Sequence, residues 1–182
     1  SFEHLFDIDD ILSADTADSY YDHIDGCLGR DGFRPRALFE QFNVEVLATT
    51  DAATDELAWH SQLLDSGWDG NVITTYRPDA TIDPEFEGFA ANLARLGELT
   101  GEDTSSWTGY LAAHRARRAF FKSFGATATD HGHPSSRTAN LPPAEAETLF
   151  SRIITGSGSA EDADLFRGQM LTEMARMSLD DG

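Results

Sequence analysis

Three short apolar runs separated by helical patterns constrain the fold of this chain more than any other feature. The runs span residues 43–49, 71–76 and 125–129, and they are rich in Val, Ile and Thr. Runs of this length and composition are typical of buried strands, and the longer stretches between them leave room for crossover helices. The sequence therefore predicts an α/β fold with about three parallel strands.

The helices are expected to begin at prolines or at residues that cap helices. Pro35, Pro84 and the pair Pro142-Pro143 suit a first helical turn, and Ser105 or Ser106 suits an N-cap. Ser13 or Asp15 is expected to cap an earlier helix that ends near Gly29. A final helix over about 159–179 carries a stripe of methionines, which we interpret as core packing.

Three parallel strands alone would leave two strand edges unpaired, so the chain is expected to be part of a larger α/β architecture. A partial eight-stranded (β/α)8 TIM-type barrel is our first interpretation, and an open doubly wound sheet is the alternative. We expect residues 1–42 to form a helical lead-in segment and residues 43–182 to form the partial barrel. The chain starts with Ser1 rather than Met, so we expect Ser1 to be an internal point of a longer protein or a processed end. The partial sheet favours an internal fragment.

The composition excludes several function classes. With 32 acidic and 13 basic residues the net charge is −19, which would repel nucleic-acid phosphates. No apolar run approaches the ~20 residues that a membrane helix needs. Cys27 is the one cysteine, so no internal disulfide can form, which fits a cytoplasmic location.

Each apolar run ends in a polar cluster, and chemistry in parallel sheets gathers at the carboxyl ends of strands. In the second cluster Pro78 ends the strand and keeps Arg77 extended, so that its guanidinium can bind a carboxylate in a bidentate manner. A structural salt bridge from Arg77 to Asp79 or Asp51 is an equally good interpretation.

The third cluster contains Asp130, His131 and His133. A carboxylate beside two histidines can bind metal, move protons or bind sugar hydroxyls. Strand alternation would place Asp130 on the opposite face from the two histidines, which argues against a metal site made by these three alone. His131 is as well explained by a hydrogen bond that shapes the loop.

Two other polar segments favour structural roles. Thr49-Thr50-Asp51 is expected to mark the start of a helix, where Asp51 would face the positive end of the helix dipole. The basic run from His114 to Arg118 is expected to lie on a solvated helix face.

Three segments, 35–51, 72–80 and 124–132, resemble the uronate (glucuronate) isomerases in content, order and spacing. They carry the motifs Ala48-Thr49-Thr50-Asp51, Tyr76-Arg77-Pro78-Asp79 and Thr129-Asp130-His131-Gly132. The resemblance implies a metal-dependent (β/α)8 barrel of the amidohydrolase superfamily. It also implies interconversion of aldo- and keto-hexuronates (glucuronate and fructuronate, galacturonate and tagaturonate) by proton transfer between C2 and C1.

By motif position, the resemblance assigns Arg77, Asp130 and His131 to substrate binding. It implies a divalent metal, commonly zinc, whose His-x-His pair and late aspartate lie outside this chain, so no metal ligand and no catalytic residue is assigned here. We therefore expect an inactive fragment of a cytoplasmic homo-oligomer that acts on a hexuronate. Two alternatives are another metal-dependent hydrolase of the same superfamily and a non-catalytic assembly module.

Overall fold

The computed structural model describes residues 2–181, and the chain divides into two compact units. The first consists of Ser1–Leu47 with Asp69–Asn71, and the second of Ala48–Trp68 with Val72–Gly182. The sequence-based division into a helical lead-in (residues 1–42) and a partial barrel that is not a complete independent domain (residues 43–182) stays a proposal.

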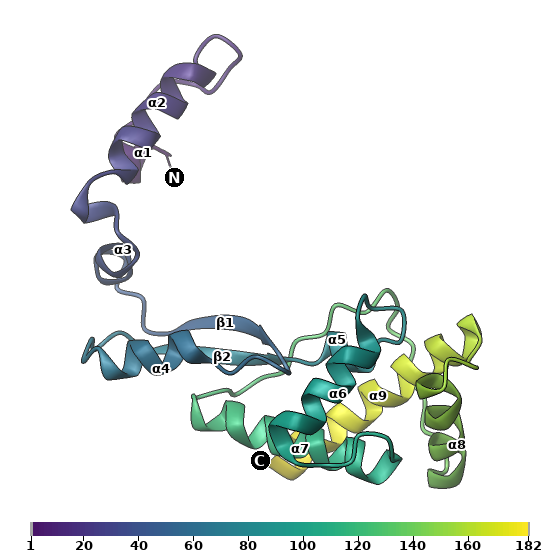
Figure 1. Ribbon diagram of the computed structural model, residues 1–182. Helices are drawn as coiled ribbons and strands as arrows, with labels where there is room; N and C mark the ends of the chain where they lie inside the picture. Colours follow the sequence, from purple (N-terminus) through teal and green to yellow (C-terminus); the bar gives the residue numbers. More distant parts are fainter. Residues whose placement is uncertain (1, 182) are drawn as a thin grey trace. The chain divides into compact units, whose positions relative to one another are not determined.

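The first unit is helical. Its elements are α1 (Phe2–Phe6), α2 (Ala17–Leu28), the 3-10 helix η1 (Asp31–Phe33) and α3 (Pro35–Gln41) (Figure 1). Helix α3 begins at Pro35 and α2 ends before Gly29, as the sequence predicts. The predicted cap of α2 is wrong: the N-cap is Thr16, whose hydroxyl donates back to the Ile11 carbonyl and closes the preceding turn.

Two parallel strands form the sheet, β1 (Leu47–Ala52) and β2 (Val72–Arg77). The N–H of Leu47 donates to the Asn71 carbonyl and that of Ala53 to the Arg77 carbonyl, which sets residue 49 beside 74 and 51 beside 76. The predicted first strand, 43–49, starts too early. Asn43 has a φ of +49°, and the Val44 N–H closes a turn onto Phe39.

The predicted third strand, 125–129, is reduced to one parallel bridge between Thr129 and Tyr76. The Tyr76 N–H donates to the Ala128 carbonyl, and the Asp130 N–H donates to the Tyr76 carbonyl. This segment therefore follows β2 only at its end, where the polar cluster begins. The bridge nevertheless places Asp130 directly beside the end of β2.

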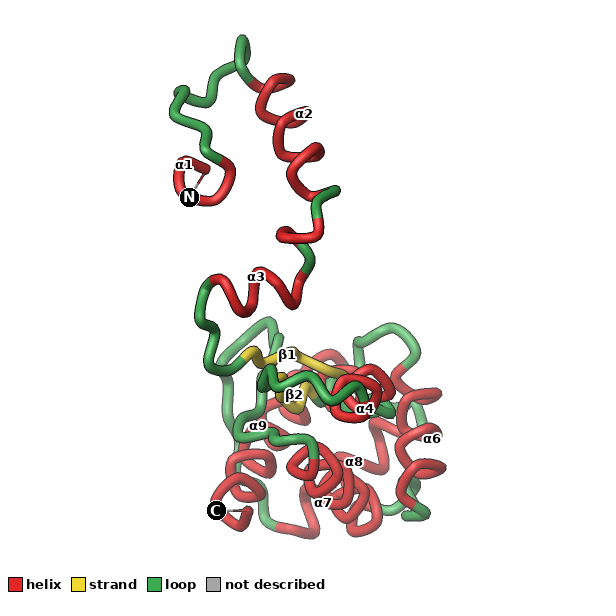
Figure 2. Tube along the Cα trace, turned by 90° about the vertical axis from the view of Figure 1, so that its left-hand side faces the viewer, coloured by secondary structure: helices red, strands yellow, loops and turns green. Residues whose placement is uncertain are grey.

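In the described residues, the helices of the second unit are α4 (Ala58–Asp65), α5 (Asp79–Ile82), α6 (Phe89–Thr100), α7 (Trp107–Ser123), α8 (Pro143–Ile154) and α9 (Ala160–Asp181). Helix α4 connects β1 to β2, α4 and α7 pack against β2, and further helices pack against α7 and one another (Figures 1 and 2). The predicted starts of α7 and α8 are confirmed. The helix predicted from Pro84 starts only at Phe89, because Gly88, with a φ of +78°, ends a run of turns there.

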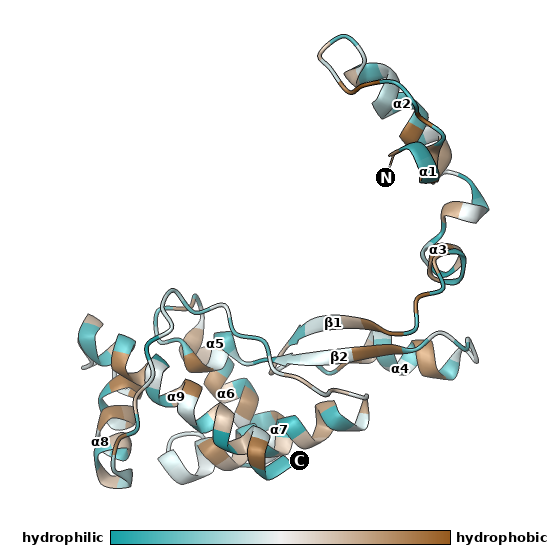
Figure 3. Ribbon diagram, turned by 180° about the vertical axis from the view of Figure 1, so that it is seen from behind, coloured by the Kyte–Doolittle hydropathy of each residue, from teal (hydrophilic) through white to brown (hydrophobic). Residues whose placement is uncertain are grey.

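The core lies between β2 and helices α5 to α9. Tyr110 of α7 stacks on Phe150 of α8 with ring centroids 4.7 Å apart, and Phe166 of α9 stacks on the same Phe150 ring. Met170, Met174 and Met177 are buried, which confirms that the methionine stripe is core. In Figure 3, β2 is brown at its apolar start and paler toward its end.

The predicted solvated face of α7 is wrong. His114, Arg117 and Arg118 are buried. Arg117 Nε donates to the Ala53 carbonyl at 2.8 Å, and Arg118 pairs with Asp181 at 2.6 Å. Arg117 thus holds the loop after β1, and Arg118 holds the end of α9. None of the helices in residues 2–181 has the length and apolar content to cross a membrane.

Candidate functional site at the strand ends

The two faces of the sheet differ in burial. Thr74 and Tyr76 lie under the helices with 0% and 2% of their surface exposed. Because strand residues alternate in direction, Arg77 and Asp130 lie on the opposite, open face, each with 43% of its side chain exposed. The structure thus brings together two of the three residues assigned to substrate binding.

Arg77 lies between two carboxylates. Its Nε is 2.8 Å from Asp79 Oδ2 and 3.4 Å from Asp130 Oδ2. Of the two structural partners weighed from the sequence, Asp79 is therefore the one that pairs with Arg77. Since the guanidinium stays partly exposed, the pair with Asp79 can orient it without occupying all of its donors.

Gly132 permits the close packing of this cluster. Its N–H donates to Asp79 Oδ2 at 2.9 Å, and a Cβ at this position would lie 2.9 Å from both Arg77 Nη2 and Asp79 Oδ2. Any larger residue would push the arginine or the carboxylate away. The glycine thus lets the loop after Thr129 approach the end of β2.

His131 and His133 lie close to Asp79. These three side chains could hold a metal ion, because their ligand atoms lie within 4.8 Å of one another. The sequence did not group Asp79 with the two histidines, because Asp79 follows the preceding strand and lies 54 positions before His133. The available signal was its place in the Tyr76-Arg77-Pro78-Asp79 cluster, at the same edge of the predicted sheet.

Burial controls the charge of the two histidines. Desolvation, then the neighbouring imidazole, lowers the pKa of His131 despite the opposing carboxylates of Asp79 and Asp130. Desolvation also lowers the pKa of His133, against the effect of Asp79. Both imidazoles are therefore neutral at neutral pH, which is the form that binds metal.

The polar residues at the end of β1 form a closed network. Asp51 Oδ2 accepts from the hydroxyls of Thr49 and Thr74, both at 2.6 Å, and Thr49 Oγ1 lies 2.9 Å from His60 Nε2. The predicted helix start at Thr49-Thr50-Asp51 is wrong, because these residues belong to β1 and α4 begins at Ala58. Asp51 therefore ties β1 to β2 and α4.

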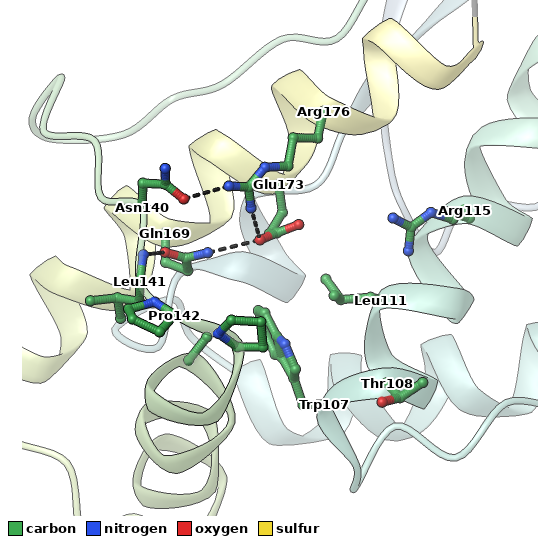
Figure 4. A pocket seen from close by; sticks show the side chains of 12 residues that line it. Trp107, Thr108, Leu111, Arg115, Asn140, Leu141, Pro142, Gln169, Glu173 and Arg176 are labelled. Carbon is green, nitrogen blue, oxygen red and sulfur yellow. Dashed lines mark hydrogen bonds and ion pairs between the residues drawn. The ribbon is translucent and has the colours of Figure 1, made fainter.

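A further hollow of about 660 Å³ lies between α7, α8 and α9 (Figure 4). Trp107 and Leu111 form its apolar wall. Across from them, Glu173 Oε1 accepts from Arg176 Nη1 at 2.6 Å and from Gln169 Nε2 at 2.8 Å. The hollow contains none of the residues assigned to substrate binding, and these polar groups satisfy one another.

Fold and site define an α/β protein that carries the polar strand ends of a partial TIM-type barrel. A family model described as glucuronate isomerase matches residues 1–182, so the chain belongs to the glucuronate isomerase family. This confirms the resemblance stated from the sequence motifs.

Individual relatives agree with the family assignment. The chain is 63% identical over 179 residues to a uronate isomerase of Mesorhizobium japonicum, covering 98% of this chain and 38% of that protein. It is 57% identical over 182 residues to one from Rhizobium meliloti, covering 100% of this chain and 39% of the relative. The chain thus spans well under half the length of these curated relatives.

Two solved structures have the same fold. A glucuronate isomerase from Caulobacter crescentus superposes with a TM-score of 0.92 at 51% identity, covering 100% of this chain and 38% of the other. A uronate isomerase from Thermotoga maritima superposes with a TM-score of 0.86, covering 99% of this chain and 40% of the other. At 23% identity this second similarity supports the fold alone. The predicted fold class, a partial β/α barrel, is confirmed.

Proposed function

We propose that this chain is the substrate-binding part of a uronate isomerase of the amidohydrolase superfamily, which interconverts aldo- and keto-hexuronates. One observation carries the proposal: Arg77 and Asp130 lie 3.4 Å apart on the open face at the strand ends. A hexuronate offers a carboxylate for the arginine and hydroxyl groups for the aspartate. The family membership supports this assignment of substrate class.

In the proposed complex, Arg77 binds the substrate carboxylate. The carboxylate replaces Asp130, the more distant partner at 3.4 Å, while Asp79 at 2.8 Å keeps the guanidinium in place. Asp130 then accepts hydrogen bonds from the sugar hydroxyls. His131, neutral and next to Asp130, is proposed to bind a further hydroxyl.

The proposed reaction moves two protons. A base removes the proton from C2 while the carbonyl oxygen at C1 gains a proton, which forms an enediol. The C2 hydroxyl then loses its proton as a proton returns to C1, so atoms balance without an external oxidant. A divalent metal, zinc by family resemblance, would polarise the carbonyl when bound. We propose that this metal's ligands and the base lie outside these residues, so that the chain alone binds substrate but does not turn it over.

The whole protein is proposed to be a cytoplasmic homo-oligomer that does not bind nucleic acid. The net charge of −19 supports the last point, because phosphates would be repelled. Cys27 is buried and forms no disulfide, which is compatible with a reducing compartment.

The test of substrate binding is an Arg77→Ala substitution in the intact protein that contains this chain. Losing a charge-assisted hydrogen-bonding partner costs about 1.5–3 kcal/mol, so KM for the uronate should rise roughly 10- to 100-fold. Arg115→Ala removes an exposed arginine of α7 and serves as the matched control, with kinetics expected to stay unchanged. Unchanged KM in Arg77→Ala would remove this residue from the site.

The isolated chain gives a second test of the same proposal. Incubated with glucuronate, with and without zinc, it should form no ketose above background. Sustained turnover would show that the base and metal ligands are present within these residues and would overturn the division of roles.

A further inference from the structure

The group formed by Asp79, His131 and His133 concentrates unpartnered polar atoms. Of the seven buried side-chain nitrogen and oxygen atoms that lack a hydrogen-bond partner in the described residues, four belong to it. They are Asp79 Oδ1, His131 Nδ1, His133 Nδ1 and His133 Nε2. Buried polar atoms are rarely left unpaired, so this concentration indicates a bound species that the described residues do not supply.

The distance between two of these atoms fits a single small cation. His133 Nε2 lies 3.8 Å from Asp79 Oδ1, which is too far for a hydrogen bond. Two ligands that each lie about 2.1 Å from one metal ion can be at most about 4.2 Å apart. The gap between the two atoms therefore matches the span across a coordinated transition metal.

Asp79 is already oriented for this role. Its Oδ2 accepts from Arg77 Nε at 2.8 Å and from the Gly132 N–H at 2.9 Å, which leaves Oδ1 directed to the histidines. Groups that hold the second oxygen of a ligating carboxylate fix its direction, as outer partners do in metal sites. The loop that carries both histidines is thus tied to the carboxylate they share.

Burial favours a metal over a water molecule. The His133 side chain is 4% exposed and the Asp79 side chain 13%. A carboxylate oxygen and one ring nitrogen from each histidine can all bind one cation, whereas a single water molecule donates only two hydrogen bonds. A cation satisfies all three acceptors at once.

We propose that Asp79, His131 and His133 form a binding site for a divalent transition metal of the zinc class. The ligands are Asp79 Oδ1 and one ring nitrogen of each histidine, and solvent completes the coordination. Two imidazoles with one carboxylate suit zinc rather than magnesium or calcium, which prefer oxygen ligands alone. The proposal goes beyond substrate binding: this metal is additional to the catalytic one, whose ligands are proposed to lie outside these residues.

The experiment measures zinc uptake by the metal-stripped 182-residue chain in equilibrium dialysis, with excess magnesium to saturate the acidic surface. One equivalent of zinc is expected per chain. His133→Gln and Asp79→Asn should each weaken binding at least about tenfold, because each removes a direct ligand. His23→Gln is the control, since His23 Nε2 lies 3.6 Å from the Cys27 thiol and could form a competing site.

Imidazole nitrogen NMR of the unmodified chain identifies the ligands without any substitution. The resonances of His131 and His133 should shift on zinc addition, while those of the other histidines stay. Uptake below one equivalent, full affinity in both ligand variants, loss of binding in His23→Gln, or zinc shifts confined to other histidines would each overturn the proposal. If a variant does not fold, as judged by circular dichroism, the NMR result decides.

Discussion

At the scale of single residues, a buried histidine of α7 links stability to pH. The hydroxyl of Tyr76 shares a 2.8 Å hydrogen bond with His114 Nδ1, and both residues are almost fully buried. Burial, with a smaller effect from Arg118, lowers the pKa of His114 to about 3. Burial also raises the pKa of the Tyr76 hydroxyl, so both groups are neutral in the folded chain.

We predict that protonation of His114 in the unfolded chain destabilises the fold as pH falls. The unfolded imidazole has an ordinary pKa near 6.5, so between pH 6.5 and 3 the unfolded state binds one more proton than the folded state. The neutral, buried His114 contributes its full stabilisation of the folded chain above pH 6.5, and about 2 kcal/mol of that free energy is lost by pH 5. Urea unfolding at several pH values measures it.

The matched variant for this prediction is His114→Gln, which keeps a polar side chain but cannot titrate. Its free energy of unfolding should depend less on pH between 6.5 and 5 than that of the unmodified chain. Equal pH dependence in the two proteins would contradict the prediction and assign the effect to other groups.

The residues of the candidate site were only partly predictable. Arg77 and Asp130 could be nominated from sequence because each directly follows a recognisable strand. The grouping of Asp79 with His131 and His133 could not, since it depends on how the loop after Thr129 folds back onto the end of β2 through the Gly132 N–H. That is a contact between segments distant in sequence.

At the scale of elements, α7 shows how a local signal sets a helix start. The Ser106 hydroxyl accepts from the Gly109 N–H at 3.1 Å, which satisfies one of the free donors of the first turn. Gly109 also packs so closely that a Cβ there would lie 2.2 Å from the Asp103 carbonyl oxygen. The start of α7 is therefore determined by a cap and by a tight turn before it.

We predict that Ser106→Ala lowers the free energy of unfolding by about 1 kcal/mol, because the capping acceptor is lost. Ser106→Thr keeps a hydroxyl at the same place and should recover most of the loss. Thermal or urea unfolding of the three proteins provides the measurement. A loss of the same size in Ser106→Thr would show that something other than the cap is responsible.

The strands were harder to place than the helices. The apolar run 43–49 has the composition of a strand, but the backbone turns at Asn43. Strand pairing starts only at Leu47, whose N–H donates to the Asn71 carbonyl. Strand limits depend on a partner from another part of the chain, whereas a helix start depends on its own neighbours. For the same reason the run 125–129 forms only one bridge.

At the scale of the whole molecule, strand β1 has an open side. Within the described residues it pairs only with β2, so its other edge carries unsatisfied backbone groups. Trp59 and Leu64 of α4 are also 76% and 67% exposed. An open edge with exposed apolar side chains promotes association with another chain.

We predict that the isolated chain self-associates, and that added salt strengthens the association. The net charge of −19 makes copies repel one another, and salt screens this repulsion. Light scattering after size-exclusion chromatography should give a mass above that of the monomer, rising with salt. A monomer at every salt concentration would contradict the prediction.

Sequence alone determined the alternation of strands and helices, the proline and serine helix starts, the methionine core and the motifs of the family, because these depend on periodicity and on neighbouring residues. Tertiary structure decided which polar residues are buried and which meet. The burial of His114, Arg117 and Arg118 and the grouping of Asp79 with two histidines arise from contacts between distant segments. Such contacts leave no periodic signal, so only the folded chain reveals them.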